Sequence, residues 1–66
     1  MQIQLNGDPR AFEAEPTISE LIASLGLTGR RIAVEVNEEI VPRSQHDETR
    51  LADGDRVEIV HAIGGG

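Results

Sequence analysis

The chain ends in three consecutive glycines, and this end carries the most unusual chemistry of the sequence. Gly64, Gly65 and Gly66 have no Cβ atoms, so this backbone is thin enough to enter a narrow protein channel. A carboxylate on Gly66 is ionised at neutral pH, because α-carboxyl groups have a pKa of about 3.5. It becomes an acyl donor only after activation, for example as an acyl-adenylate. No tag or scar is visible, so we expect Gly66 to be the natural C-terminus and 64–66 to form a flexible tail.

Other reactive groups are few. The sequence contains no cysteine and no lysine, so it offers no side-chain thiolate, persulfide or Schiff-base amine. The two histidines belong to no cluster with the spacing of a metal site, which needs three or four ligands. We expect His46 to be a solvated loop residue and His61 a plain strand-end residue. We therefore predict that the chain is not an enzyme, binds no metal or cofactor, and is acted on by other enzymes.

Size and charge limit the classes of partner. The 66 residues are enough for one domain, residues 1–66, with one small core. A net charge of −6, from 12 acidic residues and 6 arginines, argues against nucleic acid and favours a partner with a basic docking surface. The single aromatic residue, Phe12, excludes base stacking. No stretch is long enough to cross a bilayer and no leader opens the chain, so we expect a cytoplasmic protein without a membrane partner.

The N-terminal segment predicts a hairpin that could support the tail. Residues 2–5 alternate polar and apolar, as in a half-buried strand. Asn6-Gly7 is a strong hairpin signal, and Asp8-Pro9 would extend the turn. Residues 10–14 would form the returning strand, with Phe12 facing the same core.

One amphipathic helix follows, over residues 17–25. Thr17 and Glu20 have the spacing of a capping box at its start. Gly26 fits the position after its last turn, and Leu27 could supply the hydrophobic contact of a Schellman motif. An apolar stripe with helical spacing would face the core: Ile18, Leu21, Ile22 and Leu25.

The second half of the chain predicts further strands. Residues 32–36 alternate, and a turn at 37–39 leads to an apolar pair, Ile40-Val41, that could form a short extra strand. Residues 43–50 are polar and predict a surface loop. A tight turn at 53–55 precedes a last strand over 56–63. The element order indicates an α+β fold in which one helix and a small sheet share a core.

Alternation in the last strand also predicts a docking surface. Val57 and Ile59 would face the core, which places Val60 and Ala62 on the opposite face. Ala33 would share that outer face if the two strands pair. An apolar patch beside a reactive terminus is the expected docking site for an enzyme, so we predict that Val60, Ala62, Ala33 and Ile63 contact a partner.

Several motifs together resemble the ThiS family of sulfur carriers in thiamine biosynthesis. They are the ββαβ order with its capping box, Asn37 ahead of Val41-Pro42-Arg43-Ser44, the run from Gly54 to Val60, and the final Gly65-Gly66. The resemblance covers the whole chain. It implies a ubiquitin-like β-grasp fold, in which one helix crosses a small mixed sheet of four to five strands. The sequence departs from the family at His46, where a large aromatic residue is usual.

The resemblance also implies a function and its partners. An E1-like adenylating enzyme would use ATP to adenylate the carboxylate of Gly66, with Gly64 and Gly65 threading into that enzyme. A sulfur donor, such as a cysteine desulfurase or similar enzyme, would then allow conversion to a thiocarboxylate. Thiazole synthase would take the sulfur from Gly66 to form the thiazole ring of thiamine.

Three alternatives stay open at this point. The small subunit of molybdopterin synthase shares the fold and the Gly-Gly end, although it is usually longer and richer in aromatic residues. A protein modifier joined to lysines would use the same activation chemistry. A β-grasp binding module would use the fold without any chemistry at the tail, and removal of the last two glycines would then leave its function intact.

Overall fold

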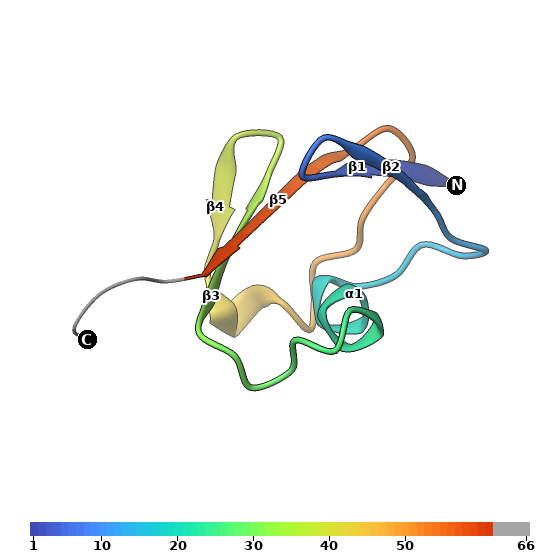
Figure 1. Cartoon of the computed structure of the whole chain (residues 1–66). Coiled ribbons are helices and arrows are strands. Elements are labelled where there is room, and N and C mark those ends of the chain that lie inside the picture. Colours follow the sequence, from blue (N-terminus) through green and yellow to red (C-terminus); the bar gives the residue numbers. More distant parts are fainter. Residues whose placement is uncertain (62–66) are drawn as a thin grey trace.

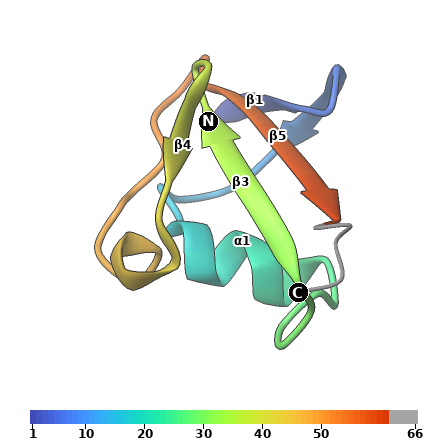
Figure 2. The same ribbon diagram turned by 90° about the vertical axis from the view of Figure 1, so that its left-hand side faces the viewer.

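The fold is a five-stranded sheet with one α-helix packed against one of its faces, as the computed structural model of residues 1–61 shows (Figures 1 and 2). The elements are β1 (Gln2–Leu5), β2 (Asp8–Ala11), α1 (Ile18–Ser24), β3 (Ile32–Val36), β4 (Glu39–Val41), a 3₁₀ helix η1 (Arg43–Gln45) and β5 (Arg56–His61). The strand order is β2-β1-β5-β3-β4. Only β1 and β5 pair in parallel, which confirms the predicted mixed sheet with one helix.

The N-terminal hairpin closes through Asn6-Gly7, as predicted. Their φ angles of 50° and 86° are both left-handed, as a two-residue type I′ turn requires. The prediction that Asp8-Pro9 extends this turn is wrong, because two residues suffice and β2 begins at Asp8, opposite Leu5. The returning strand ends at Ala11 rather than at residue 14, and Pro9 is tolerated because β2 is an edge strand.

The helix starts at the predicted capping box. The backbone N–H of Glu20 donates to the hydroxyl of Thr17 (3.1 Å), and the backbone N–H of Thr17 donates to the carboxylate of Glu20 (2.8 Å). The N–H of Thr17, followed by its hydroxyl, lowers the pKa of Glu20 below its ordinary value. Both bonds satisfy donors that helix geometry leaves without partners at the N-terminus.

The helix ends in the predicted Schellman motif. Gly26 has a φ of 73°, and its N–H donates to the carbonyl of Ala23 (3.0 Å). The N–H of Leu27 donates to the carbonyl of Ile22 (3.0 Å), which completes the pair of bonds that defines the motif. Leu27 also packs against the core, so the chain turns sharply towards β3.

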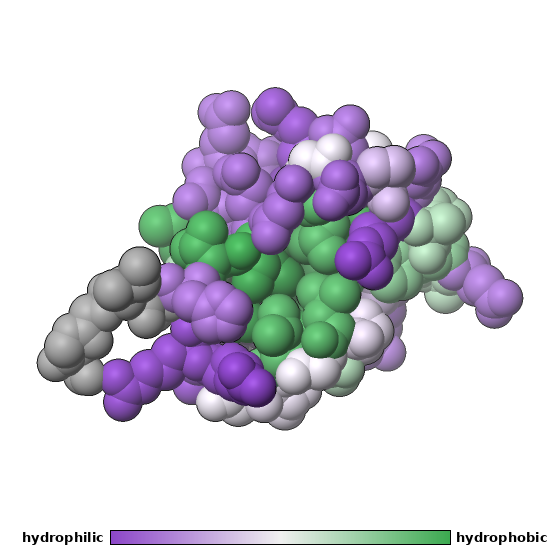
Figure 3. Space-filling view, viewed as in Figure 1, coloured by the Kyte–Doolittle hydropathy of each residue, from purple (hydrophilic) through white to green (hydrophobic). Residues whose placement is uncertain are grey.

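The core lies between the sheet and α1. On the face seen in Figure 3, apolar surface gathers in a band between the strands and the helix, with polar surface above it. Val57 and Ile59 face inwards, as predicted, whereas Glu58 is exposed. The buried apolar residues are Ile3, Leu5, Ile18, Leu21, Ile22, Val34, Leu51, Val57 and Ile59.

The segment after β4 differs from the predicted surface loop. It forms η1 and packs against the start of α1, where the N–H of Ser19 donates to the carbonyl of His46 (3.1 Å). His46 is only 7% exposed, and its Nε2 lies 2.9 Å from the carbonyl oxygen of Val41. The prediction of a solvated His46 is therefore wrong, because the residue is buried and its ring lies against the carbonyl of Val41 at the end of β4. No helix within residues 1–61 has the length and apolar character needed to cross a membrane.

Candidate functional site

Strand β5 carries the chain towards the predicted tail. It is the middle strand of the sheet and pairs with β1 on one side and β3 on the other. It is described as far as His61, so the end of the predicted strand 56–63 is not tested. The predicted site residues Ala62, Ile63, Gly64, Gly65 and Gly66 lie outside the described residues, and their roles stay predictions.

The start of β5 is anchored by Asn37 in the turn between β3 and β4. The N–H of Asn37 donates to the carbonyl of Arg56 (2.7 Å), and the N–H of Arg56 donates to Oδ1 of Asn37 (3.0 Å). Nδ2 of Asn37 also donates to Asp55 (3.0 Å). One asparagine therefore links two turns to the strand that leads to the tail. Further along β5, the side chain of Asn6 bonds to the backbone of Ile59.

The predicted docking residues Val60 and Ala33 lie together. They are directly opposite each other in the antiparallel pair of β5 and β3. Val60 is 55% exposed and Ala33 is half-buried, so the predicted outward register of the two strands is confirmed. Their contact with a partner stays a prediction.

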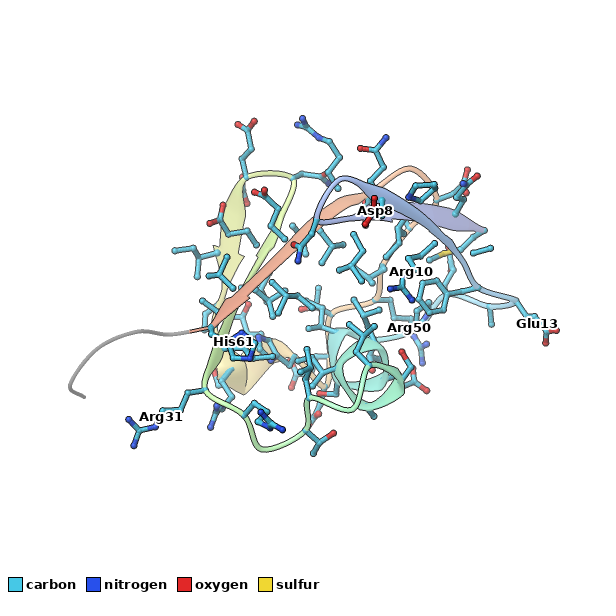
Figure 4. The ribbon with its side chains drawn as sticks, in the orientation of Figure 1. Asp8, Arg10, Glu13, Arg31, Arg50 and His61 are labelled. Carbon is cyan, nitrogen blue, oxygen red and sulfur yellow. The ribbon has the colours of Figure 1, made fainter. Side chains whose placement is uncertain are left out.

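His61 shares the inward register of Val57 and Ile59 but remains exposed at the end of β5. Its strand partner is Ile32. Figure 4 shows its side chain on the helix side of the sheet, away from the face that bears Val60. It is thus a strand-end residue, as expected.

Among residues 1–61, no group of three or more His, Asp or Glu side chains could hold a metal ion.

Sequence reasoning did not foresee how Ile40, Glu35 and Glu58 are arranged. Ile40 pairs with Glu35, and Glu35 pairs with Glu58, so the three form a row across β4, β3 and β5. The row lies on the same face of the sheet as Val60. Glu35, Glu58 and Val60 each alternate along their strands with residues that face the core, and Ile40 is paired with Glu35. Ile40 is 70% exposed. Alternation in the three strands could have indicated this row, but only once the strand order was known.

A hollow of about 270 Å³ lies at the opposite side of the molecule. It is bounded by α1, the segment before β3, and η1, and Arg43 reaches across it to donate to the carbonyl of Arg30 (3.3 Å). Ile22 and Leu27 contribute apolar walls. It is remote from the row of Ile40, Glu35 and Glu58, which lies on the other face of the sheet.

Comparison with known proteins agrees with the sequence motifs. The model of the ThiS family matches residues 3–66. The sulfur carrier protein ThiS of Bacillus subtilis is 40% identical over 65 residues, which cover 97% of this chain and 98% of that protein. A thiazole synthase of Paramagnetospirillum magneticum is 46% identical over 66 residues. This match covers the whole of this chain and only 20% of the thiazole synthase. The chain therefore spans about a fifth of that relative's length.

A solved structure shows the same fold. The crystal structure of the thiamine biosynthesis protein ThiS from Geobacter metallireducens superposes with a TM-score of 0.87 at 35% sequence identity, and each chain is covered completely. The predicted ubiquitin-like β-grasp fold is therefore confirmed. With a family match through residue 66 and relatives of equal length, the chain belongs to the ThiS family.

Proposed function

We propose that the chain is a sulfur carrier whose Gly66 becomes a thiocarboxylate and donates sulfur for the thiazole ring of thiamine. The main support is the family match over residues 3–66, which includes all three terminal glycines. Relatives of matching length, such as that of Bacillus subtilis, are named sulfur carrier proteins. The role is that of a co-substrate and not of a catalyst.

The chemistry takes place in two steps at one carbonyl carbon. A carboxylate oxygen of Gly66 attacks the α-phosphorus of ATP, which forms the acyl-adenylate and releases pyrophosphate. A sulfur nucleophile at the oxidation level of sulfide then attacks the acyl carbon and displaces AMP. The product is a thiocarboxylate. The chain has no cysteine that could carry sulfur instead, and no lysine amine that could attack the acyl-adenylate.

The fold suits this role through the position of β5. The strand is held on both sides by neighbouring strands, so the sheet fixes where residues 62–66 begin. Gly64 and Gly65 would then pass through a channel of the enzyme that excludes Cβ atoms. Val60, Ala33, Ala62 and Ile63 would contact that enzyme beside the channel entrance.

Three partners follow from this chemistry. An E1-like adenylating enzyme supplies bound ATP. A cysteine desulfurase or similar enzyme supplies the sulfur as a persulfide, which two thiols reduce to the sulfide level while they form a disulfide. Thiazole synthase accepts the sulfur, and relatives in which a segment similar to this chain makes up 20% of a thiazole synthase support that assignment. We place these steps in the cytoplasm, where ATP is abundant.

Intact mass spectrometry tests the proposal. The chain, ending at Gly66, is incubated with the adenylating enzyme of its own organism, ATP and sulfide. We expect a mass increase equal to the exchange of one oxygen for one sulfur, located in the C-terminal peptide. The loaded chain is then offered to thiazole synthase and to the large subunit of molybdopterin synthase. Sulfur loss to thiazole synthase alone supports the thiamine role, whereas loss only to the molybdopterin enzyme contradicts it.

A further inference from the structure

The sheet face opposite α1 has no covering element within residues 1–61 (Figures 1 and 2). We call its central part the outer face, made up of Ala33, Glu35, Ile40, Glu58 and Val60. Ile40 and Val60 are 70% and 55% exposed, and they are the exposed large apolar residues of the described chain. Monomeric proteins place isolated apolar residues on their surfaces, but two beside one carboxylate pair on a bare sheet face indicate a contact surface.

The carboxylate pair lies beside both apolar residues, because Glu35 pairs with Ile40 and Glu58 is two residues before Val60 on β5. Glu35 and Glu58 are directly opposite each other on β3 and β5. Residues so placed have Cβ atoms about 4.5–5.5 Å apart, and like charges there are destabilising. Glu35 is also half-buried between its neighbours. The free protein therefore keeps an arrangement that opposes its own stability.

No cation within residues 1–61 forms an ion pair with either carboxylate. Arg56 lies two residues before Glu58 on the same side of β5, but its guanidinium pairs with Glu38 in the β3–β4 turn, at 3.6 Å. A purely apolar partner would bury two carboxylates without compensation, which is costly. A partner that covers this face must therefore bring its own positive charge.

We propose that the outer face docks onto the adenylating enzyme, which places an arginine or lysine between Glu35 and Glu58 and apolar side chains over Ile40 and Val60. This inference rests on the proposed function, because it assigns the docking surface of that same activation step. A guanidinium fits best, since its planar array of donors can bond to two carboxylates at once.

The position of the outer face supports this partner. Strand β5 runs from Glu58 through Val60 to His61, and residues 62–66 follow directly. A protein seated on the outer face is thus beside the start of the segment that must enter its active site. The net charge of −6 also steers the chain towards a basic surface.

A charge-neutral double variant, Glu35→Gln with Glu58→Gln, separates docking from folding. Removal of the like-charge pair should raise the thermal midpoint of the free chain. The same change should raise the Kd for the adenylating enzyme on the order of tenfold or more, and it should flatten the salt dependence of binding. Ile40→Ser should weaken binding without lowering the thermal midpoint, because the side chain is already exposed.

The matched control is Glu13→Gln with Glu48→Gln. It changes the net charge by the same amount, and both residues are exposed. Figure 4 shows Glu13 at the far side of the molecule from β3 and β5. Equal weakening in the control would mean that only overall charge matters, and it would overturn the proposed contact. A loss of stability in Glu35→Gln with Glu58→Gln would also contradict it, because the pair would then be structural.

Two further outcomes are distinguishable. If the wild-type chain is adenylated and the double variant binds and reacts equally well, the docking surface is wrong while the carrier role stands. If the wild-type chain is not adenylated at all, the proposed function itself fails. Sedimentation of the wild-type chain provides a last check, since a concentration-dependent dimer that Ile40→Ser abolishes would show that a second copy of the chain covers this face, and the proposal would be overturned.

Discussion

The side chain of Asn6 forms two hydrogen bonds with the backbone of Ile59. The N–H of Ile59 donates to Oδ1 of Asn6 (2.8 Å), and Nδ2 of Asn6 donates to the carbonyl oxygen of Ile59 (3.2 Å). Strand β1 ends at Leu5, so the amide of Asn6 takes the place of the next strand residue. The N-terminal hairpin is thereby fixed to the strand that leads to the tail.

Replacement of Asn6 by glycine should destabilise the fold. Glycine keeps the left-handed φ of 50° without strain, so the loss combines the missing amide with the greater freedom of glycine in the unfolded chain. We expect the free energy of unfolding to fall by about 1–3 kcal/mol, since backbone groups of Ile59 lose their partners. Urea denaturation measures this, and an unchanged midpoint would show that water replaces the amide at no cost.

Asn6→Asp is the companion variant. Aspartate also tolerates a left-handed φ and keeps the acceptor for the N–H of Ile59. It loses the donor and faces the carbonyl oxygen with a negative charge. We expect it to be at least as destabilising as Asn6→Gly at neutral pH and to recover partly when the carboxylate is protonated. Equal stability of Asn6→Asp and the wild type would mean that the donor contributes nothing.

Glu20 should make stability depend on pH. Its pKa is lowered in the folded state by the backbone N–H and the hydroxyl of Thr17, relative to an ordinary value of 4.5. Its stabilising effect is therefore fully present above the unfolded pKa and is lost as the pH falls through the lower folded pKa. Glutamine keeps the capping geometry but cannot ionise.

Thermal unfolding from about pH 7 to about pH 3 should show this effect. The wild type should be more stable than Glu20→Gln at neutral pH, and the two should converge in acid. Glu39→Gln on the exposed edge strand is the control for a general loss of charge. A difference between wild type and Glu20→Gln that persists at the acid end would contradict a role for the ionised carboxylate.

Sequence patterns predicted the local features of the fold well. The capping box joins Thr17 to Glu20, and the Schellman motif depends on residues near Gly26. Both are set by contacts within a few positions, so their residue types are visible in the sequence. The inward register of β5 follows in the same way from strict alternation.

Features that depend on distant contacts were missed. The burial of His46 depends on η1 folding back onto the start of α1, and polarity alone suggested a solvated loop. The bonds between Asn6 and Ile59 join residues 53 positions apart. The row of Glu35 and Glu58 requires the order of β3 and β5 in the sheet. None of these has a local signal.

Val60→Asp should weaken binding to the adenylating enzyme without unfolding the domain. Val60 is 55% exposed and faces away from the core, so a charge there is hydrated in the free chain. At an interface the same charge would be buried without a partner, and we expect a loss of about 2–5 kcal/mol in binding. Val57→Asp is the matched control, because Val57 is 1% exposed and its replacement should unfold the chain. A collapse of stability in Val60→Asp would place its side chain in the core.

Shortening the tail by one residue tests where the sulfur is carried. Without Gly66, the new carboxylate on Gly65 would stop about 3.4 Å short of the adenylation site. A misplacement of that size can lower the rate on the order of a hundredfold or more, so loading should nearly vanish. Gly65→Val should block loading through its added side-chain atoms. We expect its thermal midpoint to stay unchanged, since the buried core that the structure describes is formed by residues between Ile3 and Ile59. Intact mass after incubation with the adenylating enzyme, ATP and sulfide measures both variants. Undiminished loading of the shortened chain, or sulfur mapped outside the C-terminal peptide, would exclude the carrier role and favour a β-grasp binding module.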